Sequence, residues 1–457
     1  MGSEVFRNGA AVAEAAGGRL CGQCGPIQSV VIDDREAGPG ALYVPIIGER
    51  LDGHAFIERA FTRGAALTLA DRPLASGRPY VLVDDTLDAL QKLAGRWKAH
   101  YGPFTVAVTG SVGKTSTKEM IASVLAEGLH VLKTQGNLNN QTGVPKTVFR
   151  MDDTVEAAVI EMGMNHAGEI DRLARIAVPD VGVITNIGTA HIEYLGSQKG
   201  IFAAKTEMLA HLAPAGVALV NGDDPFLQRL ARGESGFPSR RVLTYGFSPD
   251  LDVYADEITD NGLAGSAATL HLQNGDSLRA EIPVPGRYMI GSALVGAACG
   301  VLAGLSAEQI RAGIAAYRPA GSRMRLIEKA ELRIIDDTYN ANAPAMKEAL
   351  AVLAQAPGRR VAVLGDMREL GSESERLHRE VGETARELAI DALYTVGLQA
   401  AAIRDGAGSV PGNAFRTQDE LIAALAGIVR PGDTVLVKGS RGMALEHTVA
   451  ALGELVF

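Results

Sequence analysis

From Phe104 onward, short apolar segments alternate with amphipathic ones, and after an interruption the same alternation resumes at Leu332. Apolar strands that are each followed by an amphipathic helix are typical of a parallel sheet covered by helices on both faces. Between the two stretches, residues 251–283 alternate polar and apolar side chains, which predicts an antiparallel addition. We therefore expect two α/β domains with doubly wound sheets. Because no segment recurs at a short fixed period, a solenoid is excluded.

Two breaks divide the chain into three parts. Tyr101-Gly102-Pro103 follows a helix predicted over residues 87–99, and Arg318-Pro319-Ala320-Gly321 precedes the second alternating stretch. A length of 457 residues also suggests about three domains. In the first hundred residues, short apolar strands are predicted over residues 29–32, 42–45 and 80–83. We predict an N-terminal α/β domain over residues 1–100, a central domain with a parallel sheet over residues 101–318 and a C-terminal, Rossmann-like doubly wound domain over residues 319–457, with the two breaks as hinges.

Charge and hydropathy exclude several classes of function. The net charge is −9 and no run of five Lys or Arg residues occurs, which disfavours a general nucleic-acid or membrane surface. The longest apolar stretch, residues 293–305, is too short to span a bilayer, and Glu4 and Glu14 lie where a signal peptide needs an apolar core. We expect a cytoplasmic protein. Glycine is in excess, at 53 of 457 residues, which indicates many tight turns or backbone that approaches a ligand closely.

The cysteines do not form a disulfide framework. Only Cys21, Cys24 and Cys299 occur, which is too few and an odd number. Cys21 and Cys24 form a C-x-x-C motif, but no second pair of Cys or His residues completes a zinc site. A metal or redox role for this pair is therefore disfavoured.

Residues 109–119 read TGSVGKTSTKE and lie between a strand predicted over residues 105–108 and a helix that begins at Lys114. A strand, a glycine-rich loop and a helix N-terminus together form a phosphate-binding site, because backbone N–H groups point at the anion. Lys114 would meet the β and γ phosphates, and the Thr115 hydroxyl would bind Mg²⁺. Val108 replaces the first glycine of the general motif, so the shorter T-G-x-x-G-K-T form is the one that matches. The predicted nucleotide-binding residues are Thr109, Gly110, Ser111, Val112, Gly113, Lys114, Thr115 and Ser116.

Further polar residues follow the predicted strands, where ligands of open α/β sheets bind. Glu161 ends one strand, Asn186 follows the next, and His191 comes five residues later. Asp337 ends the first strand of the third domain. Taken singly, each is explained equally well by a helix cap, a turn or a loop histidine. Together with the phosphate loop, the residues of the central domain predict a metal and phosphate site.

Several longer segments carry a family signal. They are GERLDGH from Gly48, GNLNNQTGVP from Gly136, VIEMGMNHAGEI from Val159, TNIGTAHIEYLG from Thr185 with AAKTE downstream, DDTYNAN from Asp336, LGDMRELG from Leu364 and VKGSRG from Val437. Through these segments the chain resembles the Mur ligases over essentially its whole length. The GNLNN and GERLDGH segments are similar to those of the member that uses D-alanyl-D-alanine.

The resemblance implies an ATP-dependent ligase of the acid–amino-acid type, which acts on small molecules and is a monomer. The first domain would bind the uridine nucleotide of UDP-N-acetylmuramoyl-tripeptide, the central domain would bind ATP, and the third would bring D-alanyl-D-alanine. ATP would phosphorylate the tripeptide carboxylate, and the dipeptide amine would then displace phosphate from the acyl phosphate. The product would be the UDP-MurNAc-pentapeptide of peptidoglycan synthesis. Because carboxylate and γ-phosphate are both anionic, such an enzyme works by positioning and charge neutralisation.

The family pattern also implies two Mg²⁺ ions. One would bind Thr115, Glu161 and the β and γ phosphates, and the second would lie near His191. Since Mg²⁺ prefers oxygen ligands, a carbamylated Lys205 would supply oxygens at the second ion; without the resemblance, Lys205 would be a surface lysine that is solvated or paired with Glu207. The resemblance thus assigns catalytic roles to Lys114, Glu161, His191 and Lys205, and metal-ligand roles to Thr115, Glu161, His191 and the Lys205 carbamate.

The remaining assignments also come from the resemblance. Nucleotide contacts are implied for Asn186, Arg325, Asp337, Tyr339 and Asn340. Substrate contacts are implied for Asp33, Arg35, Arg50, Asp52, Gly53, His54, Asn137, Asn139, Asn140, Lys438, Ser440 and Arg441.

The chain departs from the family pattern at three places. The usual G-x-H-N-x-x-N reads GRYMIGS over residues 286–292, so that Ser292 stands where an adenine-side asparagine is usual. The usual D-S-R reads Asp33-Asp34-Arg35, and the added carboxylate beside a diphosphate is unfavourable unless it faces solvent. Ala343 replaces a proline. None of these departures touches the residues expected to transfer the phosphoryl group.

Two alternative functions stay open from the sequence. One is another amide ligase of the same superfamily, either a diamino-acid-adding enzyme or a folylpolyglutamate synthase. The other is a regulatory or scaffold protein that binds nucleotide through its phosphate loop without ligation; the retained Lys114, Glu161, His191 and Lys205 argue against it but do not prove turnover.

Overall fold

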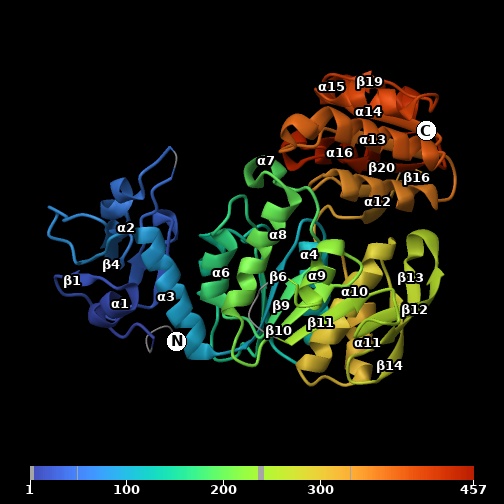
Figure 1. Ribbon diagram of the computed structural model, residues 1–457. Helices are drawn as coiled ribbons and strands as arrows, with labels where there is room; N and C mark the ends of the chain where they lie inside the picture. Colours follow the sequence, from blue (N-terminus) through green and yellow to red (C-terminus); the bar gives the residue numbers. More distant parts are fainter. Residues whose placement is uncertain (1–4, 49, 235–240, 330, 457) are drawn as a thin grey trace.

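The computed structural model describes residues 5–48, 50–234, 241–329 and 331–456. Three sheets follow one another along the chain, and helices cover each of them (Figure 1). This arrangement confirms the predicted three-part α/β fold. Among the described residues, no helix is long and apolar enough to cross a membrane.

The first sheet has five strands in the order β1-β5-β4-β3-β2. All neighbouring pairs are parallel except β1 with β5. Strands β1 and β4 add to the three that the sequence predicts, and the turn that contains Asp52 follows β3. The elements are α1 (Gly9–Ala16), β1 (Arg19–Cys21), β2 (Ser29–Val31), β3 (Ala41–Tyr43), α2 (Ile57–Thr62), β4 (Ala65–Ala70), β5 (Tyr80–Leu82) and α3 (Thr86–Tyr101).

Helix α3 joins the first sheet to the central one and contacts both parts (Figure 1). Its apolar residues form the cores on either side, and Trp97 packs between Phe6 and Phe149. The helix ends at Tyr101, because Gly102 has φ +58° and caps it in the left-handed conformation that glycine adopts at little cost. The predicted hinge therefore coincides with a capped helix end.

The central sheet has nine strands in the order β14-β13-β12-β11-β10-β9-β6-β8-β7. From β7 to β12 every pair is parallel, and β13 and β14 continue the sheet antiparallel at one edge, as the alternation over residues 251–283 predicts. The strands are β6 (Phe104–Thr109), β7 (Val131–Lys133), β8 (Ala157–Glu161), β9 (Val181–Ile184), β10 (Val217–Asn221), β11 (Arg241–Gly246), β12 (Val253–Asp260), β13 (Ser266–His271) and β14 (Ser277–Ile282).

Strand β6 lies where the chain changes direction across this sheet. The chain passes from β6 to β7 and β8 on one side and then crosses to β9 on the other. Such a switch point leaves a crevice at the carboxyl ends of the strands, where ligands bind. The helices around this sheet are α4 (Lys114–Leu125), α5 (Gly143–Val148), α6 (Glu169–Ala177), α7 (Ile192–Leu195), α8 (Gln198–Thr206), α9 (Pro225–Ala231), α10 (Arg287–Leu302) and α11 (Ala307–Ala316).

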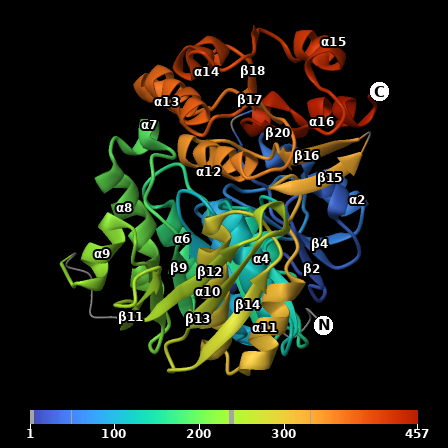
Figure 2. The same ribbon diagram turned by 90° about the vertical axis from the view of Figure 1, so that its right-hand side faces the viewer.

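The C-terminal sheet has six strands in the order β15-β16-β20-β17-β18-β19, parallel except for the β15–β16 pair. Helix α12 lies on the side of this sheet that faces the central part (Figure 2). The elements are β15 (Arg325–Lys329), β16 (Leu332–Asp337), α12 (Ala343–Ala354), β17 (Arg360–Gly365), α13 (Ser374–Glu387), β18 (Ala392–Val396), α14 (Ala400–Ala407), β19 (Ala414–Phe415), α15 (Gln418–Ile428), β20 (Thr434–Lys438) and α16 (Glu446–Gly453).

Candidate active site

A cavity of about 1510 Å³ lies at the carboxyl ends of the central strands. The central sheet provides one wall, and α12 with the ends of β16 and β20 provides the facing wall. Gly48 of the first part also reaches it; Glu49, in the same segment, lies outside the described residues. The predicted site residues that line this cavity are Ser111 to Ser116, Asn137, Asn139, Asn140, Glu161, Asn186, His191, Asp337, Tyr339, Asn340 and Lys438.

The loop between β6 and α4 has the conformation that a phosphate loop needs. Gly110 has φ +151°, and a Cβ there would lie 1.8 Å from Oγ1 of Thr185. Only glycine fits this position. Asn186 braces the loop from β9, because its Oδ1 accepts from Val112 N at 2.9 Å and its Nδ2 donates to Val112 O at 3.1 Å. The Asn186 amide thus holds the phosphate loop in shape, and its predicted contact with the nucleotide stays a prediction.

Lys114, the first residue of α4, lies folded against the loop. Its Nζ donates to Gly110 O at 2.8 Å and to Ser111 O at 3.4 Å. Desolvation lowers the pKa of Lys114, Glu161 nearby opposes that shift, and Arg323 adds to it. Binding of an anionic phosphate to the loop would restore the favourable surroundings of this ammonium group.

Glu161, at the end of β8, is a buried carboxylate of the site, with 3% of its surface exposed. Thr115 Oγ1 donates to its Oε2 at 2.9 Å, and Asn139 Nδ2 donates to its Oε1 at 2.8 Å. The parallel pairing of β6 with β8 brings the loop and this carboxylate together. A carboxylate and a hydroxyl next to the phosphate loop form an oxygen donor set that suits Mg²⁺.

His191 and Lys205 lie on the β9 side of the loop. His191 has φ +62° and lines the cavity, and its Nδ1 lies 2.9 Å from Oε2 of Glu369, although outside hydrogen-bond geometry. Lys205, on α8, has only 1% of its surface exposed. Burial and the neighbouring Lys114 hold the pKa of Lys205 well below its usual value. Lys205 is therefore not the solvated surface lysine that its sequence position alone would suggest.

No ready-made metal cage exists among the described residues, because no three His, Cys, Asp or Glu side chains gather around one point. Cys21 and Cys24 belong to no such group and are free thiols. The oxygen donors at Thr115 and Glu161 fit a magnesium ion whose remaining ligands are phosphate oxygens and water. The residues present therefore fit a metal that arrives together with a nucleotide.

The C-terminal wall holds an ion pair and a stacked ring. Lys438 Nζ donates to Asp337 Oδ2 at 2.5 Å and to Asn340 O at 3.0 Å. The guanidinium of Arg323 lies 3.5 Å from the ring centroid of Tyr339. Arg323 lines the cavity, whereas the predicted Arg325 does not. Sequence reasoning missed Arg323, and no motif there singles it out.

Ser440 and Arg441 lie behind this wall. Ser440 is buried and accepts from Arg368 N at 3.0 Å. Arg441 N donates to Asn340 Oδ1 at 3.4 Å, and its guanidinium pairs with Glu446 at 3.0 Å. Neither residue lines the cavity, so their predicted substrate contacts stay a prediction.

An arginine and a phenylalanine lie beside the ends of β10 and β11. The guanidinium of Arg287, at the start of α10, stacks 4.3 Å from the ring centroid of Phe247. Tyr288 is next to it and also lines the cavity. Ser292 lines the cavity as well, and its Oγ is 3.1 Å from Thr117 Oγ1, so that this buried pair joins α10 to α4. The departure from the family pattern at Ser292 thus places a short hydroxyl, bound to Thr117, at the edge of the cavity.

The predicted residues of the first part lie outside the cavity lining. Asp33 binds Arg35 at 2.6 Å, and this hydrogen bonding lowers the pKa of Asp33 to about 2. Asp34, whose carboxylate is unfavourable beside a diphosphate unless it faces solvent, is instead buried and pairs with Arg59 at 3.0 Å. Arg50 is exposed. The added acid is thus compensated by the protein's own arginine.

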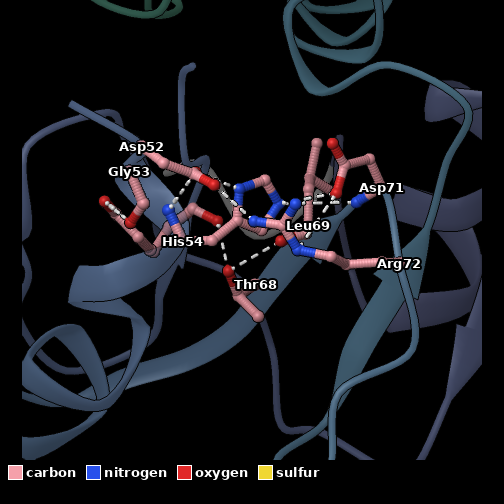
Figure 3. Close-up of polar contacts among 8 residues, drawn as sticks. Asp52, Gly53, His54, Thr68, Leu69, Asp71 and Arg72 are labelled. Carbon is pink, nitrogen blue, oxygen red and sulfur yellow. Dashed lines mark hydrogen bonds and ion pairs between the residues drawn. The ribbon is translucent and has the colours of Figure 1, made fainter. Parts of the chain in front are cut away.

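Asp52, Gly53 and His54 form a turn in which the side chains of Asp52 and His54 bind each other (Figure 3). Asp52 Oδ1 accepts from His54 N at 2.9 Å and lies 2.6 Å from His54 Nδ1. On the other side, His54 Nε2 is 3.3 Å from Asp71 Oδ1. Arg72 pairs with Asp52. With its side chain only 6% exposed, His54 connects β4 to the turn after β3.

We expect His54→Ala to lower the free energy of unfolding by about 2 kcal/mol, because both carboxylates lose a buried partner. Arg72→Ala removes an exposed ion pair and should cost less than about 1 kcal/mol. Trp97 is the single tryptophan and packs in the core beside the first sheet, so its fluorescence during urea unfolding reports the change. Unchanged stability together with a raised KM for the uridine substrate would favour the predicted substrate contact instead.

Comparison with known proteins identifies the family of this site. Three sequence models match the chain: "Mur ligase family, catalytic domain" over residues 26–98, "Mur ligase middle domain" over residues 108–300 and "Mur ligase, glutamate ligase domain" over residues 322–441. The UDP-N-acetylmuramoyl-tripeptide--D-alanyl-D-alanine ligase of Escherichia coli (strain K12) is 38% identical over 445 residues, which cover 96% of each protein. The chain belongs to the Mur ligase family.

Solved structures have the same fold as this Mur ligase. A crystal structure of MurF from Acinetobacter baumannii matches with a TM-score of 0.91 and 33% identity, over 97% of this chain and 98% of that one. MurF from Thermotoga maritima, solved in complex with ADP, matches with a TM-score of 0.84 and 28% identity, over 93% and 97% of the two chains. This Mur ligase is an ATP-dependent amide ligase.

Proposed function

We propose that this Mur ligase joins D-alanyl-D-alanine to UDP-N-acetylmuramoyl-tripeptide through an acyl phosphate. The high-coverage relatives carry this activity in their names, and the identity extends over nearly the whole chain. The observation that carries the proposal is that one cavity is lined by the phosphate loop, Glu161, the C-terminal wall and three asparagines, which are Asn137, Asn139 and Asn140. Such a cavity can hold a nucleotide, an acid and an amine together.

The phosphoryl transfer would use residues that already lie in place. Lys114 would leave the loop carbonyls and bind the β and γ phosphates, because an anion stabilises its ammonium better than two carbonyl oxygens do. Thr115 and Glu161 would hold a Mg²⁺ ion that offsets the charge between the γ-phosphate and the substrate carboxylate. Asn139 holds Glu161 at 2.8 Å and lines the same cavity, so we place the muramoyl-peptide along Asn137, Asn139 and Asn140.

We also propose that Lys205 becomes a carbamate. Burial and the nearby Lys114 lower the pKa of Lys205, which favours the neutral amine, and only a neutral amine attacks carbon dioxide. The attack forms an N–C bond and releases one proton, which leaves a carboxylate where the unmodified chain has an amine. That carboxylate would provide oxygen ligands for a second Mg²⁺ ion near His191.

The C-terminal part would bring the dipeptide to the acyl phosphate. Lys438, Asp337 and Tyr339 line the cavity opposite the phosphate loop. An acceptor amine must be neutral to attack, and a carboxylate such as Asp337 next to Lys438 can orient it without being consumed. We place D-alanyl-D-alanine at this wall, and the nucleotide between it and the loop.

The test is an ATP-dependent phosphate-release assay with a panel of acids and amines. We expect release only when UDP-N-acetylmuramoyl-tripeptide and D-alanyl-D-alanine are both present, with the pentapeptide product seen by mass spectrometry. Chelation of divalent ions with EDTA should abolish release. Release with a folate and glutamate, or with a diamino acid in place of the dipeptide, would overturn the proposal, and tight nucleotide binding without release would favour a scaffold role.

A further inference from the structure

Lys118 is a buried cation that the proposed function does not use. It lies on α4, one turn beyond Lys114, and only 1% of its surface is exposed. Lysine is rarely buried to this extent unless its ammonium is paired, because the charge loses its hydration. The partners of Lys118 therefore indicate what its charge does.

Three oxygens surround the ammonium group of Lys118. Its Nζ donates to Thr134 O at 2.7 Å and lies 3.0 Å from Glu119 Oε1. It also lies 3.7 Å from Oε2 of Glu161. The same oxygen of Glu161 accepts from Thr115 and is the one that faces the phosphate loop.

The contacts of Lys118 fix Glu161 through its backbone as well. Glu161 N donates to Thr134 Oγ1 at 2.9 Å, and Lys118 binds the carbonyl oxygen of that same threonine. A second carboxylate, Glu119, is shared between Lys118 and the more exposed Lys133, whose Nζ is 2.5 Å from Glu119 Oε2. A line of alternating charges thus runs from the surface to Glu161.

The ammonium group of Lys118 would repel a divalent ion bound to Glu161. An ion bound to Glu161 Oε2 would lie close to a fixed positive charge in a poorly hydrated site, where repulsion is strong. A nucleotide brings several negative charges to the neighbouring loop, and these offset the repulsion. The unliganded protein therefore disfavours a bare ion at Glu161.

We infer that Lys118 is a positioning residue that acts as the resting counter-ion of Glu161, so that the divalent ion enters with the nucleotide and not ahead of it. The inference rests on the proposed function only in placing a metal at Glu161. In the resting enzyme Lys118 holds this carboxylate in place and makes it unavailable to free metal. When the nucleotide arrives, the carboxylate is already in place to share its ion.

The test measures binding of Mn²⁺ alone to the nucleotide-free, full-length protein by electron paramagnetic resonance. We expect Lys118→Met to bind Mn²⁺ at least about tenfold more tightly than the wild type. Because Lys118→Met leaves Glu119 without its buried partner and can fail to fold, the double variant Lys118→Met/Glu119→Gln removes both charges and should show the same increase. Lys118→Arg keeps the charge and should retain the weak binding of the wild type.

Two controls make the result specific. Lys133→Met removes the outer charge of the same line and should leave Mn²⁺ affinity within about twofold, since Lys133 is 45% exposed and more distant. Adding Glu161→Gln to Lys118→Met should abolish the gain. Folded variants with wild-type Mn²⁺ affinity would overturn the inference and give Lys118 a purely structural role. Because this titration needs no ligation, failure of the proposed function would show only in the product assay.

Discussion

Lys114→Met is expected to reduce ATP-dependent phosphate release by at least about a thousandfold. The lysine is the cation attached to the phosphate loop itself, and loss of one group that neutralises transition-state charge costs this order of rate. Its ammonium is desolvated in the resting protein, which lowers its pKa. Removal of the charge should therefore leave the thermal unfolding temperature unchanged or slightly raised.

Single-turnover assays and thermal unfolding test this expectation together. Lys92→Met is the matched control, because Lys92 forms an exposed ion pair with Asp88 on α3 and does not line the cavity. We expect wild-type rates for this control. A Lys114→Met enzyme that keeps a tenth of the wild-type rate would show that the loop backbone and the metal neutralise the phosphates without the lysine.

Lys205→Ala is expected to lower the ligation rate at least about a hundredfold, and short carboxylic acids such as formate or acetate should restore part of it. Removal of the lysine side chain leaves a space beside α8 that can admit a small acid, whose carboxylate would replace the carbamate oxygens. Rescue is the deciding readout, since a mere packing defect in a residue that is 1% exposed would not respond to added acids.

The control for this experiment is Lys199→Ala, on the exposed face of the same helix, which should keep wild-type activity with or without added acids. Nuclear magnetic resonance of protein equilibrated with ¹³C-labelled carbon dioxide provides a readout that does not depend on turnover. A carbamate signal in the wild type that is absent in Lys205→Ala would support the modification. A variant with full activity and no acid dependence would contradict it.

The sequence was sufficient to predict those parts of the fold and the site that depend on a few neighbouring residues. The T-G-x-x-G-K-T loop between a strand and a helix predicted the β6–α4 phosphate loop, because steric limits at Gly110 and Gly113 require glycine there. The apolar alternation predicted the parallel sheets, since buried strands must be apolar on both faces. Positions after the predicted strands singled out Glu161 and His191, whereas the resemblance to the family alone supplied Lys205.

The burial and the pairing of the charged side chains depended on contacts between segments that are distant in the sequence. Nothing in the local sequence pattern distinguishes the buried Lys118 from a solvated lysine. Its burial arises because α4 packs on β7 and β8, which pair with each other and, through β8, with β6. Arg323 lines the cavity and Arg325 does not, because Arg323 lies in the turn before β15, whereas Arg325 is the first residue of that strand. Asp52 and His54 pair with Arg72 and Asp71 after β4, contacts that no local pattern predicts, and their substrate contacts stay a prediction.

By itself, then, the sequence determined the three α/β parts, the phosphate loop and the chemistry of the residues available to it. The tertiary structure decided which of those residues face one another and how their charges are compensated. The physical reason is that strand propensity and glycine geometry act over a few residues, whereas burial and charge pairing join segments such as Lys118 and Glu161 that are far apart in the chain. The electrostatics of this site is therefore a property of the fold.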